Sequence, residues 1–342
     1  MGLLDSIKDH IMIGGPNAIA GWGSLVLFTI SGGVLGGRII ADVKIFIPIL
    51  VAAAITGNGI YALNAYYDVE TDKLNKPGRP LPSGRMTPQH ALKYSQGLMA
   101  LGLFISLVAS IVTGKYLMLV LWTMFTLLGI AYSMPPLKLK SRHILGNLCF
   151  AAFTTITMFI PSLWGTPLLM QMVLYKTFFG TLMVTAIIVM KDFADYDGDK
   201  ATGSITLPVK IGKKKSAVFA MVVMAIVVII RINMFPPANT LELIKGVAPM
   251  ALYIASFGVY IVLEYIGPRT LSYPYAEVQY YFIALWGAYS FLKMPLGLNL
   301  ITWVEEWDYI IAFSIYAVLA FTTIYLAKKG TLGPKWRPFQ NR

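Results

Sequence analysis

The chain has 342 residues, of which 57% are hydrophobic and only 13% are charged. Ordinary soluble domains carry about 25% charged residues, so this deficit, with a mean hydropathy of +0.67, excludes a typical soluble protein. It indicates a chain embedded in lipid. The formal net charge is +12, which in a soluble protein would raise the question of nucleic-acid binding.

Apolar runs of the length that crosses a bilayer, about 20 residues, recur along the chain. Ten spans are expected, at residues 18–37, 45–67, 95–113, 116–133, 144–164, 169–190, 216–235, 247–266, 276–297 and 308–327. Residues 1–17 precede them with an amphipathic pattern typical of a helix at the membrane surface. Residues 300–342 hold the last span, which is a possible extra C-terminal helix, followed by a basic tail. The sequence predicts an all-α polytopic bundle, forming a single domain over residues 1–342.

Lys and Arg are distributed unequally between the two sides of this predicted bundle. With ten spans, the N-terminus, the loops 68–94, 134–143, 191–215 and 267–275, and the C-terminus share one side. That side carries 21 of the 28 Lys and Arg residues, and the positive-inside rule places it in the cytoplasm. The net charge is thus a topology signal, so we expect an integral protein of the cell membrane and no nucleic-acid partner.

A first group of polar residues lies at the end of the second predicted span. Asn64, Asp68 and Asp72 are spaced by four residues, which puts them on one face of a helix. Oxygen ligands in such a stripe suit Mg²⁺, which binds a few carboxylates and completes its octahedron with water and substrate phosphate.

A second acidic group follows the sixth predicted span. Asp192, Asp195 and Asp199 again share one helical face, whereas Asp197 lies off it. Like charges at this spacing destabilise a helix, which favours a bound cation, although solvated acids paired with nearby Lys residues are an alternative. A weak internal repeat would place the two stripes opposite each other across one cavity, where two cations would clamp a diphosphate.

Further segments have a recognisable order. Arg79-Pro80-Leu81-Pro82-Ser83-Gly84 follows the first acidic group, Tyr132-Ser133-Met134-Pro135-Pro136 ends the fourth span, and Leu207-Pro208 follows the second group. Together with both acidic stripes, they resemble the UbiA superfamily of intramembrane prenyltransferases over roughly residues 10–300. In its loops the chain looks most like the archaeal digeranylgeranylglyceryl phosphate synthase branch.

The resemblance implies nine spans around a central cavity and a transferase that moves a prenyl group with Mg²⁺, two ions bridging the diphosphate. On the matched positions, Asp68, Asp72, Asp195 and Asp199 would be catalytic. The expected metal ligands are Asn64, Asp68, Asp72, Asp192, Asp195 and Asp199. The expected substrate contacts are Asn64, Arg79, Tyr132, Ser133, Lys138 and Lys191.

The donor implied by the resemblance is an isoprenyl diphosphate, and the acceptor is a molecule soluble in membrane lipid. The loops favour transfer of geranylgeranyl to geranylgeranylglyceryl phosphate in ether-lipid synthesis. Aromatic quinone precursors (homogentisate, hydroxybenzoate or dihydroxynaphthoate) and chlorophyllide are alternative acceptors. A membrane terpene cyclase would use the same metal site without an acceptor, and a cation transporter would usually carry its acids at mid-span.

Overall fold

The computed structural model describes residues 3–14, 43–160, 163, 167–234, 236–267, 271–282 and 308–329, with the isolated positions 23, 25, 26 and 29. Every regular element within these residues is a helix, and the β-bridge found there pairs Arg142 with Ile205. The prediction of an all-α fold is therefore confirmed.

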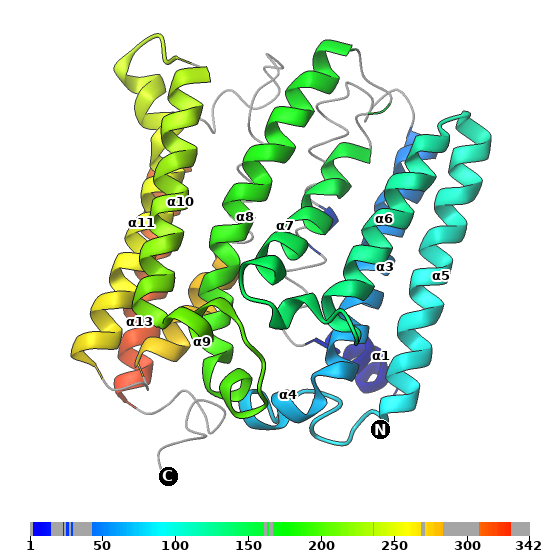
Figure 1. The fold of residues 1–342 in the computed structure, drawn as a ribbon, viewed down its shortest axis with the longest axis horizontal. Coiled ribbons are helices and arrows are strands. Elements are labelled where there is room, and N and C mark those ends of the chain that lie inside the picture. The colour runs from blue at the N-terminus through cyan, green and yellow to red at the C-terminus, as the bar shows by residue number, and fades with distance from the viewer. Residues whose placement is uncertain are drawn as a thin grey trace.

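The described helices fall into a long set and a short set. The long helices form the bundle in Figure 1: α3 (Val43–Tyr67), α5 (Pro88–Thr113), α6 (Tyr116–Ser133), α7 (Ile144–Phe159), α8 (Pro167–Ala201), α10 (Lys213–Met234), α11 (Thr240–Ile266) and α13 (Asp308–Lys328). Residues 271–282 are also helical. The short helices are α1 (Leu3–Ile11), α4 (Val69–Asn75), η1 (Leu139–Ser141) and α9 (Leu207–Ile211). Both ribbon views place α1, α4 and α9 at the same end of the bundle.

Five described helices are long and apolar enough to cross a membrane. These segments are Phe46–Tyr67, Pro88–Thr113, Tyr116–Ser133, Thr177–Ala201 and Lys213–Asn233. Three shorter apolar helices, Ile144–Thr157, Met250–Ile266 and Ser314–Lys328, lie beside them. The predicted span 18–37 and the second half of the span 276–297 fall largely outside the described residues.

The most consequential difference from the sequence prediction is at α8. The span was expected to end near residue 190 and to be followed by a loop over 191–215, but the helix continues to Ala201. At 1.5 Å per residue its 35 residues extend roughly 50 Å, against about 30 Å for the hydrocarbon core. Hydropathy marks only the part in lipid, so it missed the last turns of α8. The single helical face expected for Asp192, Asp195 and Asp199 is confirmed, because all three lie within this helix.

Helix α5 was also predicted too short, because its first turns are polar. Thr87 caps the helix, its hydroxyl accepting from the backbone N–H of His90 at 3.3 Å, and Pro88 occupies the first turn. At the other end Gly114 adopts φ 67°, a left-handed conformation that glycine tolerates without strain.

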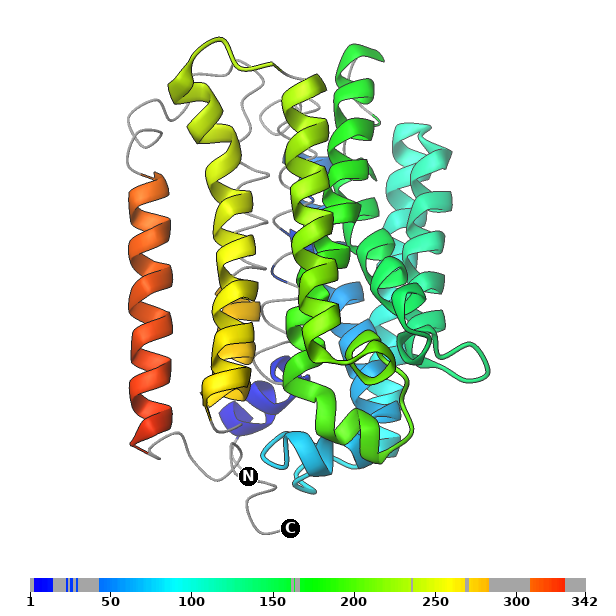
Figure 2. The same ribbon diagram turned by 60° about the vertical axis from the view of Figure 1, so that its left-hand side comes forward.

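The described helices pack as two groups, which contact each other through α6 and α7 and again where α4 meets α8. Helix α3 packs on α5 and α6, while α8 packs on α7 and α10, and α10 packs on α11. The approach of α5 to α3 needs a glycine, because a Cβ at Gly102 would lie 1.8 Å from the hydroxyl of Thr56. In Figure 2, α13 stands at the edge of the bundle next to α11. The two acidic groups therefore come from different halves, one from α3 and α4 and the other from α8.

Candidate active site

The first acidic group keeps its helical spacing although the helix changes between α3 and α4. The backbone N–H of Asp68 donates to the carbonyl of Asn64 at 2.9 Å, and that of Asp72 donates to Asp68 at 2.7 Å. Asp72 is buried, with 4% of its surface exposed. The side-chain amide of Asn64 donates to the Ser133 hydroxyl at 3.3 Å, so the end of α6 joins this group.

The second acidic group lies on the last turns of α8, beyond the end of the predicted span. Asp192 and Asp195 are buried, and the amide of Asn147 from α7 contacts Asp192 at 3.5 Å. Asp199 is close enough to Asp195, Asp192 and Asp68 for their charges to interact. The carboxylates of the two groups therefore belong to one electrostatic site.

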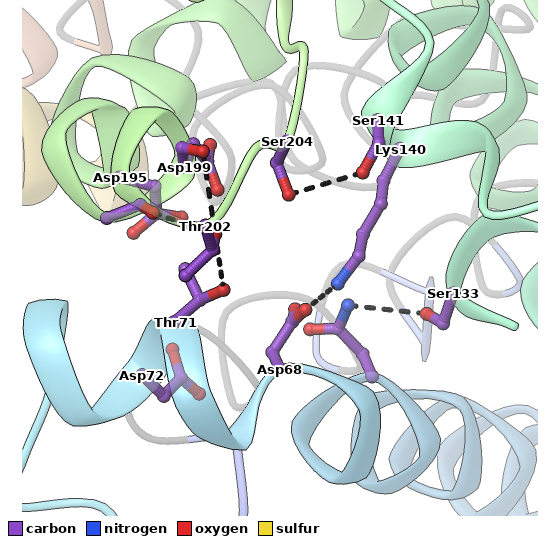
Figure 3. A network of polar contacts seen from close by, with 12 residues as sticks. Asp68, Thr71, Asp72, Ser133, Lys140, Ser141, Asp195, Asp199, Thr202 and Ser204 are labelled. Carbon is purple, nitrogen blue, oxygen red and sulfur yellow. Dashed lines mark hydrogen bonds and ion pairs between the residues drawn. The ribbon is translucent and has the colours of Figure 1, made fainter. Parts of the chain in front are cut away.

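Helix α4 is fastened directly to α8. The Asn75 side chain donates to the carbonyl of Asp195 at 3.1 Å and accepts from the backbone N–H of Gly198 at 3.1 Å. A Cβ at position 198 would lie 2.3 Å from the Asn75 amide, so the contact requires glycine there. The hydroxyls of Thr71 and Thr202 add a hydrogen bond of 3.0 Å, drawn in Figure 3.

A third segment, residues 134–143, closes the site from the other side. The backbone N–H of His143 donates to the carbonyl of Ile205 at 2.9 Å, and the Ser141 hydroxyl donates to that of Ser204 at 3.3 Å. Figure 3 shows Lys140 extending from this segment to Asp68, with which it forms an ion pair.

Basic side chains from the same three segments neutralise the carboxylates. Arg79 bonds Asp72 at 2.6 Å, Lys191 bonds Asp195 at 3.0 Å, and Lys76 also bonds Asp195. Asp68, Asp72 and Asp195 are therefore paired with cations of the protein itself, as the alternative of acids paired with nearby basic residues expected for part of each group. Such a mixed set of charges also suits a metal diphosphate, in which the carboxylates face the metal and the basic groups face the phosphate oxygens.

Arg79 remains charged despite its burial. Loss of water would lower the pKa of its guanidinium, but the carboxylates of Asp72 and then Asp195 outweigh this effect and raise the pKa above its usual value. Arg79 is thus a permanent cation beside both acidic groups, and it lies outside the membrane-spanning helices.

The donor set fits Mg²⁺ bound together with a phosphorylated ligand. Within the described ranges, no group of three or more His, Cys, Asp or Glu side chains is close enough to hold a metal ion. Mg²⁺ is typically bound by one or two carboxylates plus water and substrate phosphates, without an all-protein cage. The residues that would hold it are Asn64, Asp68, Asp72, Asp192, Asp195 and Asp199.

Buried aromatic residues adjoin these charges. Tyr132 is buried against Phe150 and Phe153, with ring centroids 5.8 and 5.9 Å away. Lys191 lies near the hydroxyls of Tyr132, of Tyr61 from α3 and of Tyr280 from residues 271–282. An apolar prenyl chain would therefore meet aromatic walls directly beside the charged groups.

The structure brings together most of the residues singled out in the sequence. Both acidic groups, Asn64, Arg79, Ser133 and Lys191 meet at one end of the bundle, and Tyr132 adjoins them. Lys138 is the exception. Within the described part of the chain its ammonium forms no ion pair with either acidic group, and Lys140 forms the ion pair with Asp68 instead. Sequence reasoning missed Lys76, Lys140, Asn75, Asn147 and Tyr280. The available signal was that Lys76 and Lys140 lie in the same basic loops as the chosen residues.

Comparison with known proteins identifies the family. The UbiA prenyltransferase family model matches residues 25–276. Digeranylgeranylglyceryl phosphate synthase from Methanothrix thermoacetophila is 33% identical over 215 residues, which cover 62% of this chain and 74% of the relative. The protein of the same name from Thermococcus gammatolerans is 34% identical over 198 residues, covering 55% and 66%.

Solved structures share the fold. A UbiA homologue from Archaeoglobus fulgidus bound to GPP and Mg²⁺ matches with a TM-score of 0.58 at 17% identity, over 84% of this chain and 100% of that one. A structure from work on digeranylgeranylglyceryl phosphate synthase in membranes matches with a TM-score of 0.57 at 22% identity, over 85% and 100%. The family match spans well over half of the sequence, and so the chain is an integral membrane protein of the UbiA prenyltransferase family.

Proposed function

We propose that this prenyltransferase moves a geranylgeranyl group from its diphosphate to geranylgeranylglyceryl phosphate, with two Mg²⁺ ions in the site. The observation that carries the proposal is the convergence of both acidic groups and four basic side chains at one end of the bundle. The relatives named digeranylgeranylglyceryl phosphate synthase support this acceptor.

In the proposed reaction, bound Mg²⁺ would neutralise diphosphate charge as the C–O bond breaks. The chain supplies the ligands from Asp68, Asp72, Asp195 and Asp199, with Asn64 and Asp192 assisting. Arg79, Lys76, Lys140 and Lys191 are placed to bind phosphate oxygens. The Asn64–Ser133 contact fixes the amide next to Asp68, and Tyr61, Tyr132 and Tyr280 exclude water from the allylic carbon.

The test is a transfer assay of the purified protein with Mg²⁺, labelled geranylgeranyl diphosphate and a panel of acceptors. We expect labelled product with geranylgeranylglyceryl phosphate, far less with geranylgeranylglycerol, which lacks the phosphate, and none after addition of EDTA. Preferential labelling of homogentisate, hydroxybenzoate, dihydroxynaphthoate or chlorophyllide would refute the acceptor. A labelled hydrocarbon formed without any acceptor would identify a terpene cyclase.

We also propose that nine or ten spans cross the cell membrane and that the site faces the cytoplasm. The support is the excess of Lys and Arg on the side of the site, since loops rich in these residues stay inside. Helices α3 and α8 bring both acidic groups to that same end of the bundle.

Cysteine labelling in sealed, oriented vesicles tests this topology after Cys149 is replaced by Ala. Glu70→Cys, on an exposed position of α4, should react only with a reagent that reaches the cytoplasmic side. Lys115→Cys, an exposed position between α5 and α6 at the opposite end, is the matched control and should react from outside. The reverse pattern would invert the topology.

A further inference from the structure

The end of α8 is electrostatically unfavourable as an isolated helix. Asp195, Asp197 and Asp199 all lie in its last two turns, before the helix ends at Ala201. Carboxylates at a helix C-terminus oppose the helix dipole, and like charges four residues apart repel each other. Contacts from outside the helix must therefore keep these turns folded in the arrangement that the metal site needs.

Asp197 lies on the opposite side of α8 from Asp195 and Asp199, since two residues turn a helix by about 200°. There its carboxylate accepts a hydrogen bond of 2.5 Å from the Tyr273 hydroxyl. The ammonium of Lys213 lies 3.4 Å from the same hydroxyl and 4.5 Å from the ring centroid of Tyr196, the residue before Asp197. The Tyr273 phenol and the Lys213 ammonium thus contact α8 on the side opposite to Asp195 and Asp199.

This group is itself anchored in the bundle. Lys213 forms an ion pair of 2.8 Å with Glu264, and only 9% of the surface of Lys213 is exposed. The second oxygen of Glu264 accepts from the Ser272 hydroxyl at 2.7 Å and the Tyr260 hydroxyl at 3.4 Å. The first residue of α10, the end of α11 and the start of the helix at 271–282 therefore share one polar network behind α8.

We propose that Tyr273, Lys213 and Glu264 are positioning residues that hold the end of α8 in place before metal and diphosphate bind. On the front of α8, the carboxylate of Asp195 contacts Lys76 and Lys191, and the ligand would compete with it for these two cations. Asn75 of α4 contacts only the backbone there, at Asp195 and Gly198. The contacts at the back face away from the site and persist when it is filled. The inference rests on the proposed function, because the carboxylates being positioned are the proposed metal ligands.

Tyr273→Phe tests the proposal by removing one hydroxyl and keeping the ring. The Mg²⁺ concentration for half-maximal prenyl transfer should rise about tenfold, the order of effect of one hydrogen bond to a charged group. The rate at saturating Mg²⁺ should change by less than about twofold, because bound metal then orders the same turns. A structural defect elsewhere would lower the rate at every Mg²⁺ concentration.

Tyr265→Phe is the matched control. The Tyr265 hydroxyl accepts a hydrogen bond of 2.9 Å from Lys214, the neighbour of Lys213. The substitution therefore removes an equivalent Lys–Tyr hydrogen bond between α10 and α11 and leaves the contacts of α8 unchanged. The half-saturating Mg²⁺ concentration of this variant should match the wild type. Asp197→Asn keeps an oxygen that accepts from Tyr273 and should resemble the wild type, whereas Asp197→Ala should resemble Tyr273→Phe.

Hydrogen exchange of the protein without metal or substrate gives a readout independent of activity. Amides of residues 195–201 should exchange faster in Tyr273→Phe and Asp197→Ala than in Tyr265→Phe, and Mg²⁺ with inorganic diphosphate should restore protection. Equal exchange in all variants would overturn the positioning role, even if transfer is observed. Faster exchange in a protein that transfers no prenyl group would instead refute the proposed function and leave the network intact.

Discussion

Asp195→Asn is expected to reduce prenyl transfer by at least about a hundredfold, the order of loss when one group that stabilises charge in the transition state is removed. Asp195 lies in the centre of the site, paired with Lys76 and Lys191 and close to Asp199. Asn keeps the shape, but its single amide oxygen can accept from only one of the two ammonium groups, and the negative charge required by a cation is lost. The measurement is the transfer rate at saturating Mg²⁺.

The matched control is Asp197→Asn, the same substitution two residues away on the same helix. Because Asp197 faces Tyr273 and not the metal site, its change should lower the rate at saturating Mg²⁺ by less than about threefold. Asp195→Ala is a poorer probe, since it leaves two poorly exposed ammonium groups without their carboxylate and should also lower stability. Equal losses in the two Asn variants would show that the proposed metal-binding face of α8 is wrong.

Lys140→Met should lower transfer by about ten- to a hundredfold, the range for a hydrogen bond to a charged group. The Lys140 side chain is only 11% exposed and pairs with Asp68, which places its ammonium among the groups that would meet the diphosphate. Met preserves the length of the side chain and removes the charge. Steady-state kinetics with varied geranylgeranyl diphosphate should show most of the loss as a higher KM for the donor.

Lys138→Met is the control for this variant. Lys138 lies in the same segment, two residues earlier, and was the basic residue that the sequence favoured. In the structure the ion pair with Asp68 is formed by Lys140. Lys138→Met should therefore change the donor KM by less than about threefold. A larger effect at Lys138 than at Lys140 would restore the original assignment and show that the segment 134–143 rearranges when the donor binds.

The sequence by itself determined the membrane class, the helical fold and which carboxylates of each acidic group share a helical face. Each of these depends on local properties: the length of apolar runs, the four-residue spacing of Asn64, Asp68 and Asp72, and the 3.6-residue period that separates Asp197 from Asp195 and Asp199. Such patterns involve residues within a few turns of a single helix, so they can be recognised without knowing what the helix packs against. The span at 116–133 even coincides with α6.

The tertiary structure decided which cation meets which carboxylate and where the helices end outside the lipid. Lys140 and Asp68 are 72 residues apart, Lys76 and Asp195 are 119 apart, and Tyr273 and Asp197 are 76 apart. Nothing local distinguishes Lys140 from Lys138, because the choice depends on the path of residues 134–143 against Ile205. Hydropathy likewise cannot predict how far a helix continues beyond the bilayer. The last turns of α8 contact α4, α10 and residues 271–282. Contacts between distant segments, and not propensity, therefore shaped the acidic end of α8.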